Sequence, residues 1–249
     1  MNELVKLLLL FSVGSIAGFI NVMAGGGSTL TLPILIFLGM EGSLANGTNR
    51  VAVFIQNISA VISFKQEKFS QFRFSLKLAA ITLPGAIIGA LISVNISDET
   101  FKKILAFIMI GIIFTLIIPK SKKNSIKNGD SYNPWLLYPA LFGIGFYGGF
   151  IQAGVGFLIM AALHHLVKLN LIHVNMHKVF IISFYSIPAI IIFTITKNIN
   201  WIYGLTLAGG MAFGAWWSAK LAIKKGDKVI RVILLVAIFI MALKLLKIF

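Results

Sequence analysis

The sequence contains no cysteine and very few acidic residues. Without cysteine, the chain can form neither disulfides nor thiolate-bound zinc or iron–sulfur sites. Only 7 of its 249 residues are Asp or Glu, and charged residues of both signs make up 12%, about half the fraction in an ordinary soluble domain. So little polar surface cannot cover a water-soluble globule. The composition therefore predicts that lipid covers much of the protein.

Apolar residues make up 58% of the chain and gather in long runs. A helix needs about 20 apolar residues to cross a hydrocarbon core of about 30 Å. The pattern predicts an all-α fold, a polytopic helical membrane protein with about eight to ten membrane segments. We expect these at 4–24, 28–40, 46–64, 74–94, 104–118, 135–153, 157–168, 178–195, 201–222 and 229–248. The second and seventh are short and each follows a glycine cluster, which predicts broken or re-entrant helices.

The net charge of +15 comes from 22 basic residues. No RNA- or DNA-binding motif accompanies them, so we do not expect nucleic acid as a partner. More than half of them lie in three stretches between apolar runs, within 65–77, 120–127 and 220–231. Basic loops mark the cytoplasmic side of membrane proteins. We therefore expect a multi-pass protein in the lipid bilayer of a cell membrane, and the abundance of Lys, Ile, Asn and Phe is typical of a prokaryote.

Short motifs recur in the same order in the two halves of the chain. Gly18-Phe19-Ile20 resembles Gly149-Phe150-Ile151, and two further pairs of motifs recur at a spacing of 129 residues: Gly25 and Gly27 with Gly154 and Gly156, and Asn46 and Thr48 with Asn175 and His177. These recurrences predict a first repeat over 1–119, a basic cytoplasmic linker over 120–133 and a second repeat over 134–249. The three basic stretches lie on one face if each short segment crosses the membrane together with the segment before it, or if neither crosses. Each repeat then contains an odd number of crossings. The halves would then be inverted repeats, as in many secondary transporters.

A glycine cluster interrupts the first apolar run. It consists of Gly25, Gly26 and Gly27 and leads into Ser28 and Thr29. A helix that restarts after such a break offers unpaired N–H groups, hydroxyls and the positive end of its dipole to an anion. We therefore expect a backbone anion site here, with a matching break at Gly154 and Gly156. The alternative is that these small residues only allow helices to pack closely.

Polar and charged side chains accompany each break. They are Asn46, Thr48 and Arg50 in the first half, and Gln152, Asn175, His177 and Lys178 in the second. Charges at membrane depth usually face a cavity or a partner, so two cations near two helix starts favour an anionic substrate. We expect the cations to supply charge and the other side chains to supply hydrogen bonds. The alternatives are that the cations extend to the membrane surface, that Asn46 and Asn175 are N-caps, and that Gln152 bonds between helices.

Two glycine pairs, Gly85 with Gly89 and Gly210 with Gly214, have the spacing that lets two helix backbones touch. We expect them to mark the places where the two halves pack against each other.

No pattern predicts a catalytic centre, a metal site or a cofactor. The sequence has no G-x-S-x-G elbow, no paired intramembrane aspartates and no His-Glu-x-x-His helix. No acidic residue lies deep in an apolar run. If transport is coupled to protons, a histidine is therefore the natural carrier, and His177 is the best placed of the four.

The motifs together resemble the sulfite exporter TauE/SafE family of membrane permeases. The residues that carry the resemblance are Gly18-Phe19-Ile20, Gly25-Gly26-Gly27 with Leu32-Pro33-Ile34-Leu35, Ala45-Asn46-Gly47-Thr48-Asn49, the Pro84-Gly85 and Gly210 stretches, and the run from Gly148 to Gly156. The resemblance spans nearly the whole chain. It implies a duplicated helical permease for sulfur-containing anions such as sulfite or organosulfonates.

Three other functions stay open at this point. An anion-selective channel would give flux that never saturates, and an intramembrane enzyme would alter its substrate chemically. A membrane scaffold that binds partners through its basic loops would move no anion. We expect a permease that works by alternating access around a site near the middle of the membrane.

Overall fold

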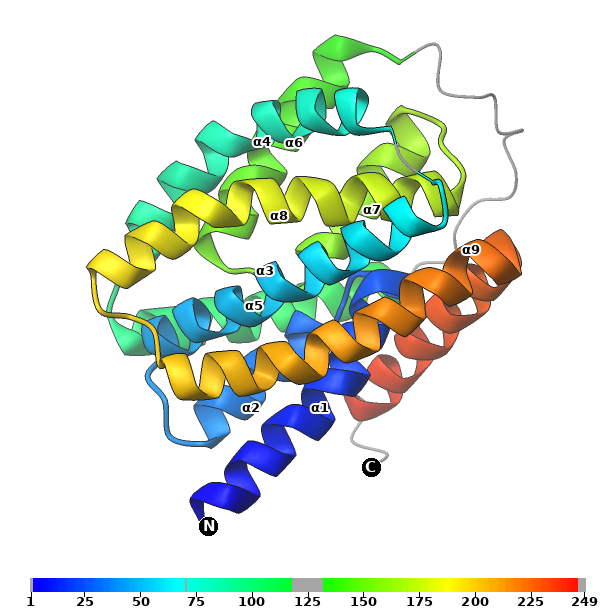
Figure 1. Cartoon of the computed structure of the whole chain (residues 1–249). Helices are drawn as coiled ribbons and strands as arrows, with labels where there is room; N and C mark the ends of the chain where they lie inside the picture. The colour runs from blue at the N-terminus through cyan, green and yellow to red at the C-terminus, as the bar shows by residue number, and fades with distance from the viewer. Residues whose placement is uncertain (1, 70, 118–131, 246–249) are drawn as a thin grey trace.

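The computed structural model describes residues 2–69, 71–117 and 132–245 (Figure 1). Within these residues the chain is all α-helical, as predicted. The helices are α1 (Glu3–Ala24), α2 (Ser28–Phe37), α3 (Gly42–Gln66), α4 (Phe72–Ser93), α5 (Asp98–Ile117), α6 (Pro134–Phe150), α7 (Val155–Leu166), α8 (Leu171–Ile195) and α9 (Trp201–Leu245). The expected linker over 120–133 lies almost wholly outside the described residues.

Three of the described helices are long and apolar enough to cross a membrane on their own: α1, the Arg73–Ser93 part of α4, and α8. The α3 helix is as long as α8, with 25 residues, but it carries a run of polar residues through its first half. That run lies against other helices, since Asn46, Asn49 and Arg50 are fully buried. The polar residues of α3 therefore lie inside the bundle.

Both predicted breaks are present. Gly25 ends α1 with a φ of 88°, and its N–H donates to the carbonyl of Asn21. Gly154 precedes α7 with a φ of 70°. This left-handed conformation is open to glycine and strained for other residues, so it ends α1 at Gly25 and sets the start of α7 at Gly154. The short helices α2 and α7, of 10 and 12 residues, follow the two breaks.

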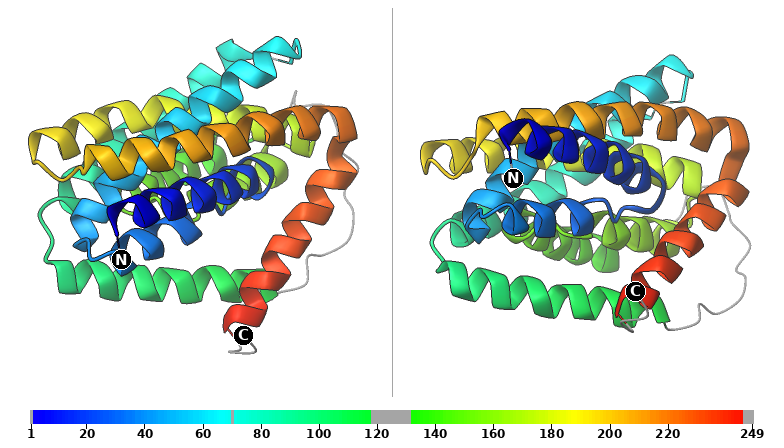
Figure 2. Two further views of the ribbon diagram at one scale, coloured as in Figure 1. Left: turned by 60° about the horizontal axis from the view of Figure 1, so that its bottom comes forward. Right: turned by 90° about the horizontal axis from the view of Figure 1, so that it is seen from below.

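The prediction that 201–222 and 229–248 are separate helices joined by a basic loop is wrong. The structure has one helix of 45 residues, α9, which changes direction sharply where its colour passes from orange to red (Figure 2). The stretch 220–231 contains no proline and only one glycine, Gly226. Its lysines, alanine and leucine favour helix, so nothing local stops it.

The two halves pack through two similar helix crossings, α1 against α9 and α6 against α4. Gly14 and Gly18 of α1 face the backbone of α9, and Gly210 and Gly214 of α9 face the backbone of α1. The second crossing has the same pattern, with Gly145 and Gly149 on α6 and Gly85 and Gly89 on α4. A Cβ atom at any of these glycines would overlap the partner backbone, so the predicted close packing is confirmed.

The α3 and α8 helices lie side by side between the two crossings (Figure 1). Each half therefore contributes a broken helix, a short helix and a long inner helix in the same order. This arrangement supports a duplicated chain. The inversion of the two halves relative to a membrane stays a prediction.

Candidate functional site

The two helix breaks touch each other. A Cβ atom on Gly25 would lie 2.6 Å from the backbone N of Phe157, and one on Gly156 would lie 2.5 Å from the Cα of Gly25. Gly26 faces the Phe157 ring. The fold thus brings the two expected glycine motifs together from opposite halves. At Gly25 and Gly156, however, the missing side chains allow the two backbones to touch.

The residues of the first break form hydrogen bonds with one another and with Asn21. The hydroxyl of Thr29 donates to the carbonyl of Gly26 over 2.6 Å, and the N–H of Gly27 donates to the side-chain oxygen of Asn21 over 3.1 Å. Ser28 is buried beside them. A backbone anion cradle over Gly25–Thr29 stays a prediction, and several of its groups already have partners inside the protein.

Arg50 of α3 binds the end of α6, the broken helix of the other half. Its guanidinium donates to the carbonyls of Gly148 (3.1 Å), Gly149 and Phe150 (3.4 Å). The last carbonyls of a helix have no partner within the helix and carry its negative dipole end, so a cation suits them. The Phe193 ring covers the guanidinium at 4.8 Å from its centroid.

Lys178 of α8 makes the reciprocal contact with the end of α1. Its ammonium group donates to the carbonyls of Asn21 over 2.9 Å and Val22 over 2.7 Å. It also donates to the side-chain oxygen of Asn175 over 2.8 Å and contacts the sulfur of Met160 at 3.5 Å. Each half therefore supplies a cation that binds the end of the other half's broken helix.

Neither cation reaches the membrane surface, because Arg50 is 0% exposed and Lys178 is 1% exposed. In the described ranges no carboxylate forms an ion pair with either of them. The ion pairs there join lysines to Glu3, Asp98 and Glu99 near helix starts. The alternative that the cations extend to the surface is therefore wrong, since both side chains turn inward to the carbonyl ends of helices.

Several donors around Arg50 lack a partner. We call a buried donor an open donor when it has no hydrogen-bond partner among the described residues. Arg50 Nε, Gln152 Nε2 and the Tyr185 hydroxyl are open donors. The other end of the Gln152 amide accepts from Arg50 over 3.3 Å, so Gln152 bonds from the segment between α6 and α7 to α3. We refer to Arg50, Gln152 and Tyr185 as the Arg50 cluster.

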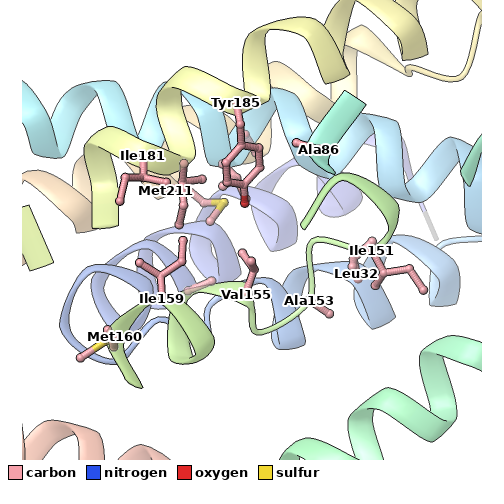
Figure 3. Close-up of a cluster of buried hydrophobic side chains, with 14 of the residues drawn as sticks. Leu32, Ala86, Ile151, Ala153, Val155, Ile159, Met160, Ile181, Tyr185 and Met211 are labelled. Carbon is pink, nitrogen blue, oxygen red and sulfur yellow. The ribbon is translucent and has the colours of Figure 1, made fainter. Parts of the chain in front are cut away.

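Tyr185 reaches the Arg50 cluster from α8. Figure 3 shows its hydroxyl pointing towards the segment that carries Ala153 and Val155. A Cβ atom on Gly148 would lie 2.7 Å from that hydroxyl, and Arg50 binds the carbonyl of the same glycine. Tyr185 was not among the residues predicted from the sequence, because a tyrosine in an apolar run has no motif of its own. Its spacing of 129 residues from Gln56 was an available signal.

The matching groups around Lys178 bond to one another. The side chain of Asn21 donates to the side-chain oxygen of Gln56 over 2.6 Å, and the Gln56 side-chain amide donates to the side-chain oxygen of Asn57 over 3.5 Å. Asn57 in turn donates to the backbone of Val53 over 2.7 Å. We refer to Lys178, Asn21, Gln56 and Asn175 as the Lys178 cluster. Its one open donor is Asn175 Nδ2.

The N-cap alternative for Asn46 and Asn175 is wrong, because both lie inside helices that begin earlier. Asn170 is the N-cap of α8, and its side-chain oxygen accepts from the N–H of His173 over 2.9 Å. At the start of α3, the N–H of Gly42 donates to Asp98 over 2.5 Å. Asn46 instead donates to Ser93 over 2.9 Å and to the Phe150 carbonyl over 2.8 Å.

Thr48 and His177 lie apart from the two cation contacts. The Thr48 hydroxyl accepts from the backbone N–H of Asn200 over 2.9 Å, which fixes the loop before α9. The His177 ring bonds Ser75 of α4 over 2.7 Å and packs edge-on against Phe74. Its other ring nitrogen has no partner among the residues that the structure describes. Both side chains are fully buried.

Comparison with known proteins places the chain among membrane transporters. A probable membrane transporter protein from Haemophilus influenzae is 30% identical over 240 residues, which cover 96% of this chain and 94% of that protein. The probable membrane transporter protein YfcA of Escherichia coli K12 is 29% identical over 239 residues, covering 96% and 88%. The probable membrane transporter protein YunE of Bacillus subtilis is 26% identical over 262 residues, covering 95% and 96%. Among solved structures, none matches the chain significantly.

The family model described as sulfite exporter TauE/SafE matches residues 10–245, which is nearly the whole chain. The resemblance that the glycine motifs indicated is thereby confirmed, and so is a multi-pass membrane protein of the transporter class. The match covers both helix breaks and both buried cations. This chain belongs to the sulfite exporter TauE/SafE family of membrane transporters.

Proposed function

We propose that the chain is a secondary transporter that moves a small anion, sulfite or an organosulfonate, by alternating access. The observation that carries the proposal is the pair of buried cations, Arg50 and Lys178, which form no ion pair within the described ranges. Burying a charge without a counter-charge is expensive. The ends of α1 and α6 offset part of this cost, and a bound anion would offset more.

The positions of the cations suit alternating access. Arg50 belongs to the first half and bonds Gly148, Gly149 and Phe150 of the second. Lys178 belongs to the second half and bonds Asn21 and Val22 of the first. A movement of one half against the other would change both contacts at once. Since both cations are shielded from solvent, an anion can reach them only after such a movement.

A proton could accompany the anion through His177. Neutral imidazole has one donor and one acceptor nitrogen, and Ser75 occupies one of the two ring nitrogens here. The other nitrogen has no partner in the described part of the chain, and it can accept a proton when the nitrogen that faces Ser75 carries the ring hydrogen.

The test is flux in proteoliposomes. Purified protein is reconstituted, and uptake of radiolabelled sulfite, sulfate and a small organosulfonate is followed with and without an imposed pH gradient. We expect saturable uptake of sulfite or the sulfonate, and accumulation that follows the pH gradient. Flux that does not saturate and cannot accumulate the anion would indicate a channel. Absence of flux for every anion tested would contradict the proposal.

A further inference from the structure

The two cation clusters occupy matching places in the two halves. At the spacing of 129 residues, Gln56 of the Lys178 cluster matches Tyr185 of the Arg50 cluster, and Met23 matches Gln152. Lys178 itself matches Asn49, the residue before Arg50. A duplicated fold could in principle carry an anion site at each place. The hydrogen bonds show that the two places are not equivalent.

The Lys178 cluster is nearly complete without a ligand. An ammonium group has three donors, and Lys178 has three oxygen acceptors, the carbonyls of Asn21 and Val22 and the side chain of Asn175. Gln56, the counterpart of Tyr185, accepts from Asn21. An anion placed here would have to displace bonds that already exist.

The Arg50 cluster is incomplete. Its three open donors belong to three side chains, Arg50, Gln152 and Tyr185, and each of these residues is 0% exposed. A buried donor without a partner destabilises the folded protein, because it has lost its hydrogen bonds to water. Three such donors at the end of one helix therefore indicate that something accepts from them when the protein works.

We propose that the protein binds one anion per chain, at the Arg50 cluster, and that Lys178 is a fixed clamp on α1. This inference rests on the proposed function and adds Tyr185 to its site. Donors on three separate side chains suit an oxyanion, whose oxygens accept along several directions. Arg50 Nε supplies a charged donor, while its two Nη atoms remain on the end of α6. The Phe193 ring shields the guanidinium face.

Two tyrosines beside the second break provide the test, the buried Tyr185 and the partly buried Tyr147. The hydroxyl of Tyr185 is an open donor, whereas that of Tyr147 donates to the carbonyl of Ala153. Phenylalanine replaces either ring without changing its volume much. We would measure binding of radiolabelled sulfite and of methanesulfonate to the purified full chain in detergent, and the Tm of each variant without ligand.

For Tyr185→Phe we expect the Kd for the oxyanion to rise about tenfold to a hundredfold, the effect of losing one hydrogen bond to a charged group. Its Tm should stay the same or rise, because an unpaired buried hydroxyl is removed. For Tyr147→Phe we expect the reverse, a lower Tm with an unchanged Kd. Gln152→Leu should weaken binding in the same direction as Tyr185→Phe. Binding to the wild type should saturate at one anion per chain, and excess chloride should compete weakly.

An unchanged Kd in both Tyr185→Phe and Gln152→Leu, or saturation at two anions per chain, would overturn the inference while the proposed transport stands. A wild type that neither binds nor moves sulfite or methanesulfonate would instead remove the proposed function, and the inference with it.

Discussion

The Arg50 and Lys178 clusters are built alike and bonded differently. Each cation lies on a long inner helix of its own half and binds the carbonyl end of the other half's broken helix. Around Lys178 the neighbouring polar groups bond to one another, while around Arg50 three donors remain open. A duplicated fold therefore fixes where a cation is needed at the end of a broken helix. The side chains beside it decide whether that place is closed or can receive a ligand.

The largest expected effect concerns the two left-handed glycines at the breaks, Gly25 and Gly154. Gly25→Ala would add left-handed strain and an overlap with the backbone of Gly156, destabilising the protein by about 3–5 kcal/mol. Gly154→Ala adds strain at its φ of 70°, of about 1–2 kcal/mol. Thermal unfolding in detergent measures both, with Gly143→Ala as the control, because a Cβ atom there meets nothing within 4 Å. Equal losses at Gly25 and Gly154 would contradict the contact between the breaks.

Arg50→Gln should reduce saturable anion flux at least a hundredfold, because it removes the charge and one open donor together. Arg50→Lys should recover part of the flux, since an ammonium group restores charge without the planar guanidinium. Proteoliposome uptake at several substrate concentrations separates KM from kcat. Flux of Arg50→Gln equal to that of the wild type would show that the buried charge serves folding alone.

Lys178→Met should act mainly on stability. It leaves the carbonyls of Asn21 and Val22 without their cation, and we expect a loss of about 2–4 kcal/mol in the free energy of unfolding. The Kd for the anion should change much less than in Arg50→Gln. If Lys178→Met weakened anion binding as strongly as Arg50→Gln, the two clusters would be equivalent and the clamp assignment would be wrong.

The smallest expected effect concerns how the two inner helices begin. The α8 helix is capped locally by Asn170, whereas α3 is capped by Asp98 from another helix. Asn170→Ala and Asp98→Ala should each lower stability by about 1 kcal/mol. In amide hydrogen exchange, Asn170→Ala should loosen only the first turn of α8, while Asp98→Ala should loosen the starts of both α3 and α5. Loosening confined to α3 would show that Asp98 does not link the two helices.

Much of the fold followed from local sequence. Long apolar runs predicted an all-helical membrane protein, and Gly25 and Gly154 predicted the two breaks, because only glycine adopts the left-handed conformation readily. The paired glycines at 85, 89, 210 and 214 predicted the crossings between the halves, since small residues let backbones touch. The prediction of two separate segments in place of α9 was wrong for a local reason too. A basic stretch without proline continues a helix as easily as it forms a loop.

The sequence by itself determined that the protein lies in lipid and that its helices break at glycines. It also determined that two cations, Arg50 and Lys178, adjoin apolar runs in a chain with few acidic residues. Those properties depend on composition and on the conformational limits of single residues. Only the tertiary structure decided that each cation binds the other half, that Tyr185 joins Arg50, and that one cluster is closed and the other open. These facts depend on hydrogen bonds between residues about 100 to 160 positions apart, and no local pattern specifies such partners.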